Sequence, residues 1–138
     1  EALPEAQRNR IEWGMRVVHE IQHSGPLSRM LFDYGYGKPE VAVFPYWSER
    51  PPVVVSDDAV RWIVLARRKE KTLLMVLTSW SEKDVRPMVS FNTSSLGFSP
   101  AGRRVMDAES GEVVAPDARS PFSVNLKGPY GVRILRTE

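Results

Sequence analysis

The segment His19-Glu20-Ile21-Gln22-His23 carries the residue types and the spacing of the zinc peptidase signature H-E-x-x-H. On a helix, two histidines four positions apart share one face and bind Zn²⁺ through ring nitrogens, while the intervening glutamate acts as base on the metal-bound water. A small zinc peptidase, with His19 and His23 as ligands and Glu20 as base, is therefore one hypothesis for this chain.

The rest of the sequence weakens the zinc hypothesis. A catalytic zinc needs a third protein ligand, and the chain has two histidines and no cysteine. Asp33 and Glu40 are the candidates for that ligand, but both lie in a Gly- and Pro-rich segment that does not fix their position. Gly25 follows His23 by two positions, where the extended form of the motif needs three. We therefore expect no metal site and no cofactor, and interpret the two histidines as polar residues near a helix C-terminus, where positive charge is favourable.

Aromatic side chains form the second candidate site. Six of the 13 aromatic residues fall between positions 32 and 47. Their rings can stack on the apolar faces of sugars or anchor a protein interface, and the alternative is that they pack a helix onto the rest of the chain. The candidate contact residues for carbohydrate or a partner are Tyr34, Tyr36, Phe44, Tyr46 and Trp47, next to Phe32. No residue of this set is a catalytic candidate.

The first elements that position these residues are a helix and a connector. Apolar residues recur at helical spacing along residues 4–23, which predicts one helix that Ser24-Gly25-Pro26 ends. Residues 1–31 are therefore assigned to a helical segment. Residues 32–52 are rich in Gly, Pro and aromatic residues and predict a connector with at most one short strand, at 41–44.

Residues 53–138 predict the β part of the fold. Two β-branched and apolar runs, 60–68 and 72–80, flank the charged triplet Lys69-Glu70-Lys71, which indicates a hairpin. Both faces of 72–80 are apolar, so we expect a central strand covered on both sides. Further short strands are expected at 85–92, 103–108, 112–115, 122–127 and 130–137. The predicted fold class is mainly β: an antiparallel β-sandwich with a leading N-terminal helix and an aromatic-rich connector.

Four stretches of this β part occur in an order that resembles a known domain. They are "VRWIVLARRKEKTLLMVLTSWSEKDV", "FNTSSLGFS", "MDAESGEVV" and "FSVNLKGPYGVRILRTE". In this order they resemble the C-terminal β-sandwich domain that follows the (β/α)8 barrel in many glycoside hydrolases. The connector "FPYWSERPP" is similar to the aromatic run that leads from the last barrel helix into that domain.

The resemblance implies a role but no chemistry for the chain itself. Residues 1–31 would be a remnant of the barrel's end, and the chain would be a non-catalytic accessory domain that stabilises the barrel and borders its carbohydrate site. The catalytic carboxylates of such enzymes lie on the barrel strands, so the resemblance implies no catalytic residue here. The alternatives are an independent carbohydrate-binding module and the zinc peptidase described above.

Composition narrows the partners. With 42% hydrophobic and 26% charged residues and a net charge of +2, the chain is typical of a soluble, single-domain globular protein. No apolar run approaches the about 20 residues of a membrane span, so no membrane partner is expected. The basic run at 66–71 lies at the predicted hairpin tip without stacking aromatics, so no nucleic-acid partner is expected. The expected partner is a (β/α)8 catalytic domain missing from this chain, or a second copy, with carbohydrate as a further ligand. The absence of an initial methionine suggests derivation from a longer protein, and the compartment stays open.

Overall fold

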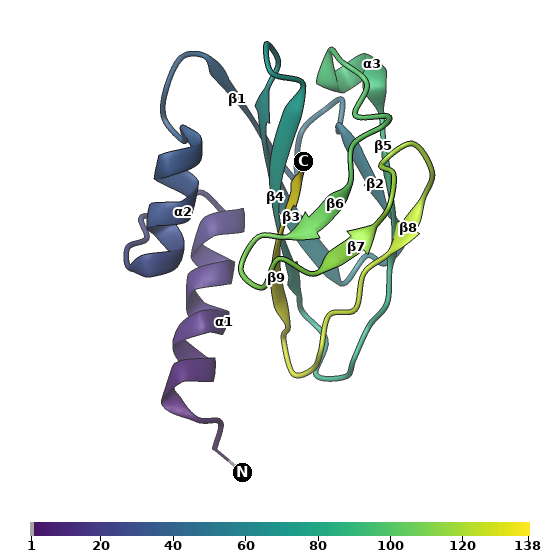
Figure 1. The fold of residues 1–138 in the computed structure, drawn as a ribbon. Coiled ribbons are helices and arrows are strands. Elements are labelled where there is room, and N and C mark those ends of the chain that lie inside the picture. Colours follow the sequence, from purple (N-terminus) through teal and green to yellow (C-terminus); the bar gives the residue numbers. More distant parts are fainter. Residues whose placement is uncertain (1) are drawn as a thin grey trace.

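The computed structural model describes residues 2–138 and has three layers: two helices, a six-stranded sheet and a three-stranded sheet (Figure 1). The helices are α1 (Glu5–Val18), α2 (Pro26–Tyr34) and a short α3 (Thr93–Leu96). The strands are β1 (Val41–Pro45), β2 (Val53–Val55), β3 (Val60–Arg67), β4 (Thr72–Ser79), β5 (Met88–Phe91), β6 (Val105–Asp107), β7 (Val113–Ala115), β8 (Phe122–Ser123) and β9 (Val132–Thr137). All strand pairs are antiparallel, which confirms the predicted mainly β, antiparallel fold with a leading helix.

The strand order places the predicted hairpin at the centre of the larger sheet. That order is β1-β3-β4-β9-β6-β7, and β2-β5-β8 form the smaller sheet. β3 pairs with β4 from Val60 opposite Ser79 to Arg67 opposite Thr72, so the predicted hairpin is confirmed. The C-terminal strand β9 lies on the other side of β4, which joins the end of the chain to its middle.

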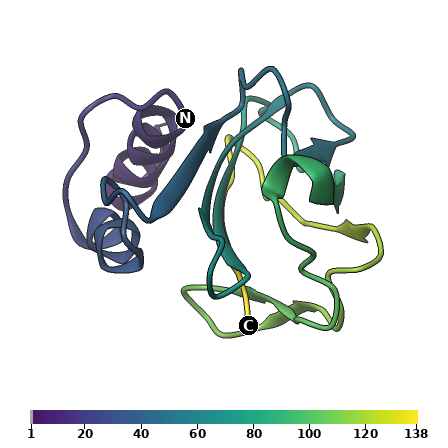
Figure 2. The same cartoon turned by 90° about the horizontal axis from the view of Figure 1, so that it is seen from above.

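β4 supplies side chains to two separate cores. Leu73, Met75 and Leu77 face the smaller sheet, while Leu74 and Val76 face the helices, because successive side chains of a strand point to opposite faces. Seen from above, the strands of the larger sheet pass between the helices and the smaller sheet (Figure 2). The prediction that residues 72–80 form a central strand covered on both sides is therefore confirmed.

Helix α1 is attached to the sheet by close packing and by one arginine. A Cβ added at Gly14 would lie 2.8 Å from a methyl carbon of Thr78 and 2.8 Å from one of Val132, so glycine lets the helix approach the strands closely. The Arg10 guanidinium donates to both carboxylate oxygens of Glu109 at 2.8 Å and to the Val132 carbonyl at 2.6 Å. The helix therefore shares a core with the sheet.

The prediction of one helix over residues 4–23 is wrong, because α1 ends at Val18. The Glu20 N–H donates to the Val17 carbonyl and the Ile21 N–H to the Arg16 carbonyl, and Glu20 has a φ of 53°. This is the hydrogen-bond pattern of a helix end closed by a left-handed residue, where glycine is the usual choice. Because a glutamate occupies the position, the sequence carries no sign of the break.

The second helix, α2, was not predicted. It begins at Pro26, which suits the first helical turn, and ends at Gly35, which has a φ of 119°. The segment 32–52 therefore contains the last turn of α2 and the whole of β1, whose bounds agree with the strand expected at 41–44. The five strands expected after residue 80 are all shorter than predicted, and the differences are largest at 85–92, which contains only β5, and at 122–127, which contains only β8.

Candidate functional site

The six connector aromatics do not form one platform. Phe32 and Trp47 are half exposed, at 50% and 53% of their surface, and the other four are partly buried. Phe44 packs against the core between the two sheets, with the Arg68 guanidinium 5.7 Å from its ring centroid. Tyr34 packs against the core beneath the helices, and its hydroxyl lies 2.9 Å from the Thr72 hydroxyl. Phe44 and Tyr34 therefore contribute to the two cores. Tyr36 also packs against the helix-side core and Tyr46 against both, and these two rings form two groups with Phe32 and Trp47.

The first group, which we call the tryptophan surface, consists of His19, Tyr46, Trp47, Arg61 and Trp80. The Tyr46 and Trp47 rings meet edge to face at 5.1 Å, and the His19 ring lies 5.5 Å from both Tyr46 and Trp80. Trp80 is 44% exposed, so two tryptophans of this surface face solvent. The end of α1, the residues after β1 and the residue after β4 come together here.

Arg61 holds the tryptophan surface together from β3. Its guanidinium carbon lies 5.3 Å from the Tyr46 ring centroid and 5.1 Å from that of Trp80, within the range of cation–π contacts. It also donates to the backbone carbonyl of Asp58. One cation therefore contacts both rings and links Tyr46 to Trp80.

The second group, which we call the histidine surface, consists of His23, Phe32 and Tyr36. Their rings are within 27° of parallel, with centroids 5.7 to 5.9 Å apart. The buried Ser28 hydroxyl lies 2.6 Å from His23 Nδ1 and accepts a hydrogen bond from the Trp13 indole at 2.8 Å. Burial lowers the pKa of His23, so the neutral ring is favoured in this position.

Glu20 connects the two surfaces. The Tyr36 hydroxyl donates to the Glu20 carboxylate at 3.0 Å, and Glu20 follows His19 of the tryptophan surface in the chain. Burial and the neighbouring Glu20 charge together raise the pKa of Tyr36 to about 12. Residues 19–23 thus lie between the aromatic groups, although the sequence suggested another role for them.

The zinc hypothesis lacks its structural premise. His19 caps α1, with Nδ1 2.7 Å from the Met15 carbonyl, whereas His23 lies beyond the helix and contacts Ser28. The two histidines therefore do not share a helix face, and the Glu20 carboxylate is bound to Tyr36. Within residues 2–138, no group of three or more His, Cys, Asp or Glu side chains is placed to hold a metal ion.

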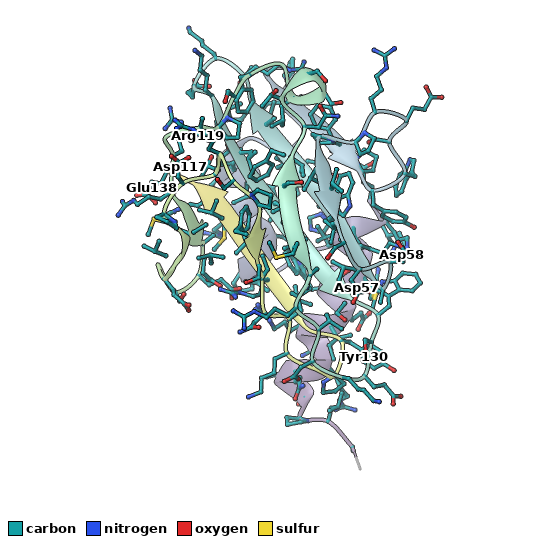
Figure 3. The ribbon with its side chains drawn as sticks, turned by 90° about the vertical axis from the view of Figure 1, so that its right-hand side faces the viewer. Asp57, Asp58, Asp117, Arg119, Tyr130 and Glu138 are labelled. Carbon is teal, nitrogen blue, oxygen red and sulfur yellow. The ribbon has the colours of Figure 1, made fainter. Side chains whose placement is uncertain are left out.

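The acidic side chains of the sandwich turns have structural partners. Asp57 accepts a hydrogen bond from the Ala59 N–H at 2.8 Å. Asp117 accepts from the N–H groups of Gly102 and Arg119, and these bonds lower the pKa of Asp117. Figure 3 shows Asp57 and Asp117 on opposite sides of the sandwich, too far apart to act on one bond.

Sequence reasoning missed Trp80, Arg61 and His19 as members of the aromatic site. Trp80 follows β4, Arg61 is the second residue of β3 and His19 belongs to an apparent metal motif, so none of the three had a sequence signal that linked it to the connector. Their proximity depends on the β3–β4 pairing and on the position of α1 against β4. Only the three-dimensional fold brings them to Tyr46 and Trp47.

Two further findings bear on membrane partners and on relatives. Within the part of the chain that the structure describes, no helix has the length and apolarity needed to cross a bilayer. Comparison with known proteins found no matching family model, no matching curated protein and no matching solved structure.

Proposed function

We propose that this chain is a non-catalytic accessory β-sandwich domain of a glycoside hydrolase-like protein, in which it stabilises a (β/α)8 barrel and borders its carbohydrate site. The observation that carries the proposal is the tryptophan surface, where the side chains of Trp47 and Trp80 are 53% and 44% exposed. The two rings are linked through Tyr46 and His19, which lie between them in a series of ring contacts. Contiguous exposed aromatic rings are uncommon on soluble monomers and mark contact sites. The barrel is the partner that would cover them.

The position of α1 supports this assignment. The helix shares a core with β4 and is clamped by the Arg10 contacts to Glu109 and Val132. In the accessory-domain hypothesis α1 is the last helix of the barrel, so its firm attachment to the sandwich would hold the two domains in a fixed orientation. His19, at the end of this helix, belongs to the tryptophan surface, which supports a barrel contact at that surface if α1 is the last barrel helix.

The environment of the carboxylates supports a non-catalytic role. Asp57 and Asp117 accept hydrogen bonds from their own turns, and Asp107 is paired with Arg133 at 3.0 Å. Glu109 is paired with Arg10 at 2.8 Å. Each of these groups has a partner that explains its position without a substrate.

The test uses the complete reading frame from which the chain comes. We expect its product to hydrolyse at least one of a panel of aryl glycosides, while residues 1–138 alone hydrolyse none. Trp47→Ala in the complete protein should lower its melting temperature, because the barrel contact loses a large aromatic ring. A complete product that lacks a second domain, or that hydrolyses no glycoside, would contradict the proposal.

A second candidate is an independent carbohydrate-binding module, which the contact of Arg61 with both the Tyr46 and the Trp80 ring favours. Exposed rings held at fixed positions can stack on successive sugars of a polysaccharide. In this case residues 1–138 alone should be retained by an insoluble polysaccharide, and both Trp47→Ala and Trp80→Ala should abolish retention. Under the accessory-domain proposal these variants weaken association with the barrel, and retention of residues 1–138 by the polysaccharide is the same for the variants as for the wild type.

A further inference from the structure

We infer that the groove between α1 and residues 22–24 binds a neutral oligosaccharide, an inference that rests on the proposed carbohydrate role. The groove has a volume of about 430 Å³, within the range of about 300–1,000 Å³ that is usual for ligand sites. Its lining includes Asn9, Glu12, Trp13, Arg16, Gln22 and His23. The groove shares His23 with the histidine surface and no residue with the tryptophan surface.

Hydrogen bonds from Arg16 link the two walls of the groove. On the wall formed by α1, Arg16 donates to the Glu12 carboxylate at 3.1 and 3.2 Å. Arg16 also donates at 3.2 Å to the Gln22 carbonyl, which belongs to the opposite wall. Such an exposed pair contributes little to stability, so its effect is on geometry. The two walls are therefore joined before a ligand arrives.

The lining matches the chemistry of a sugar. Sugar hydroxyls donate and accept hydrogen bonds, and the exposed amides of Asn9 and Gln22 also do both. Because Glu12 and Arg16 neutralise each other at 3.1 Å, the groove favours a ligand without net charge. His23 Nδ1 is taken by Ser28, so Nε2 is the ring nitrogen left for a ligand.

A second groove extends the site toward an aromatic ring. This groove, of about 340 Å³, shares His23 and Ser24 with the first and is also lined by Arg29 and Phe32. Phe32 is 50% exposed, and its ring, which is nearly parallel to that of His23, can stack on the apolar face of a pyranose. Because the two grooves adjoin across His23 and Ser24, the site fits a chain of at least two sugars.

The four tryptophan indole N–H signals give a direct test by NMR. Residues 1–138 are titrated with neutral hexasaccharides of α- and β-linked glucose, xylose and mannose, and the signals are assigned with Trp→Phe variants. We expect at least one sugar to shift the signal of Trp13, which lines the groove, and to leave those of Trp47 and Trp80 in place.

Matched variants identify the residues responsible. Gln22→Ala should weaken binding about fivefold, the effect of one lost hydrogen bond. Phe32→Ala should weaken it by a similar factor of about five through the lost stacking contact. Val54→Ala, an exposed position on the smaller sheet away from both aromatic surfaces, is the control and should bind the sugar as the wild type does, and dispersed spectra check that each variant is folded.

Other results would overturn the inference. It is wrong if no sugar of the panel shifts the Trp13 signal, or if shifts occur only at Trp47 and Trp80. Glycosidase activity of the complete reading frame does not depend on this titration, so the groove can fail while the accessory role holds. If the Trp13 signal responds to a sugar but the reading frame encodes no second domain, the groove inference stands and the accessory-domain proposal is rejected.

Discussion

At the scale of single residues, the histidines of the 19–23 segment contact rings instead of a metal. His23 packs against Phe32 and Tyr36 and shares the buried Ser28 hydroxyl with Trp13. Protonation would add a charge to this partly buried ring, which burial disfavours, as the lowered pKa of His23 indicates. This ring is therefore where acid should affect the protein.

The first prediction concerns pH. Burial lowers the pKa of His23 in the folded state below its unfolded value of about 6.5, so its stabilising effect is present above that pH and is lost as the pH falls through the folded pKa. Urea unfolding at a series of pH values from 8 to 5 should show a steeper loss of stability for the wild type than for His23→Gln. Parallel curves for the two proteins would contradict this.

The second prediction concerns the helix-facing core. Leu74 is 2% exposed and lies between β4 and the helices. Leu74→Ala should cost about 2–5 kcal/mol of unfolding free energy, measured by denaturant titration, because it leaves a cavity. Val54→Ala is the control: Val54 is 58% exposed, and its truncation should change stability by less than about 0.5 kcal/mol.

At the scale of elements, the prediction of strands from sequence was more successful than that of helices. The β3–β4 hairpin and β1 could be predicted because runs of β-branched and apolar residues extend through each of these strands. The end of α1 could not be found, because a left-handed Glu20 resembles any other helical glutamate in sequence. α2 did have a signal, since Leu27, Leu31 and Tyr34 recur at helical spacing between two glycines, but its nine residues were read partly as connector.

The third prediction concerns the contact between α1 and the sheet. Alanine is favoured over glycine in a helix by about 1 kcal/mol, yet here its methyl group would meet Thr78 and Val132 at 2.8 Å. Gly14→Ala should therefore destabilise the protein by about 1–3 kcal/mol in thermal or urea unfolding. The penalty should be smaller in a Val132→Ala background. A Gly14→Ala variant more stable than the wild type would show that the helix can move away without loss.

At the scale of the whole molecule, the two cores meet through the shared sheet, and the exposed aromatic surfaces gather around the helical layer. The sequence shows that aromatic rings concentrate at positions 32–47, and their role in contacts remains a prediction. It could not predict their division: Phe44 packs against the core between the sheets, whereas Tyr46 packs against both cores and contacts His19 and Arg61. Only Phe44 lies in a strand, opposite Val64 of β3, so strand periodicity does not set the side of the other rings.

The fourth prediction concerns association of the isolated chain. Residues 1–138 should self-associate or bind a hydrophobic dye through the tryptophan surface, and Trp47→Ala should reduce both, as measured by sedimentation velocity and dye fluorescence. Val54→Ala, which removes an equally exposed apolar side chain from the smaller sheet, should change neither. A strictly monomeric wild-type chain that binds no dye would contradict the prediction.

The central position of β4 has a consequence for how the chain opens. Its backbone amides are bonded to β3 on one side and to β9 on the other, and its side chains enter both cores. Detachment of either the helices or the smaller sheet would therefore expose apolar side chains of β4 to water. The free energy of opening is therefore high for each of the two layers. Hydrogen–deuterium exchange of β4 amides should accordingly require global unfolding, with an opening free energy equal to that from urea titration, while amides of residues 19–25 exchange through local opening.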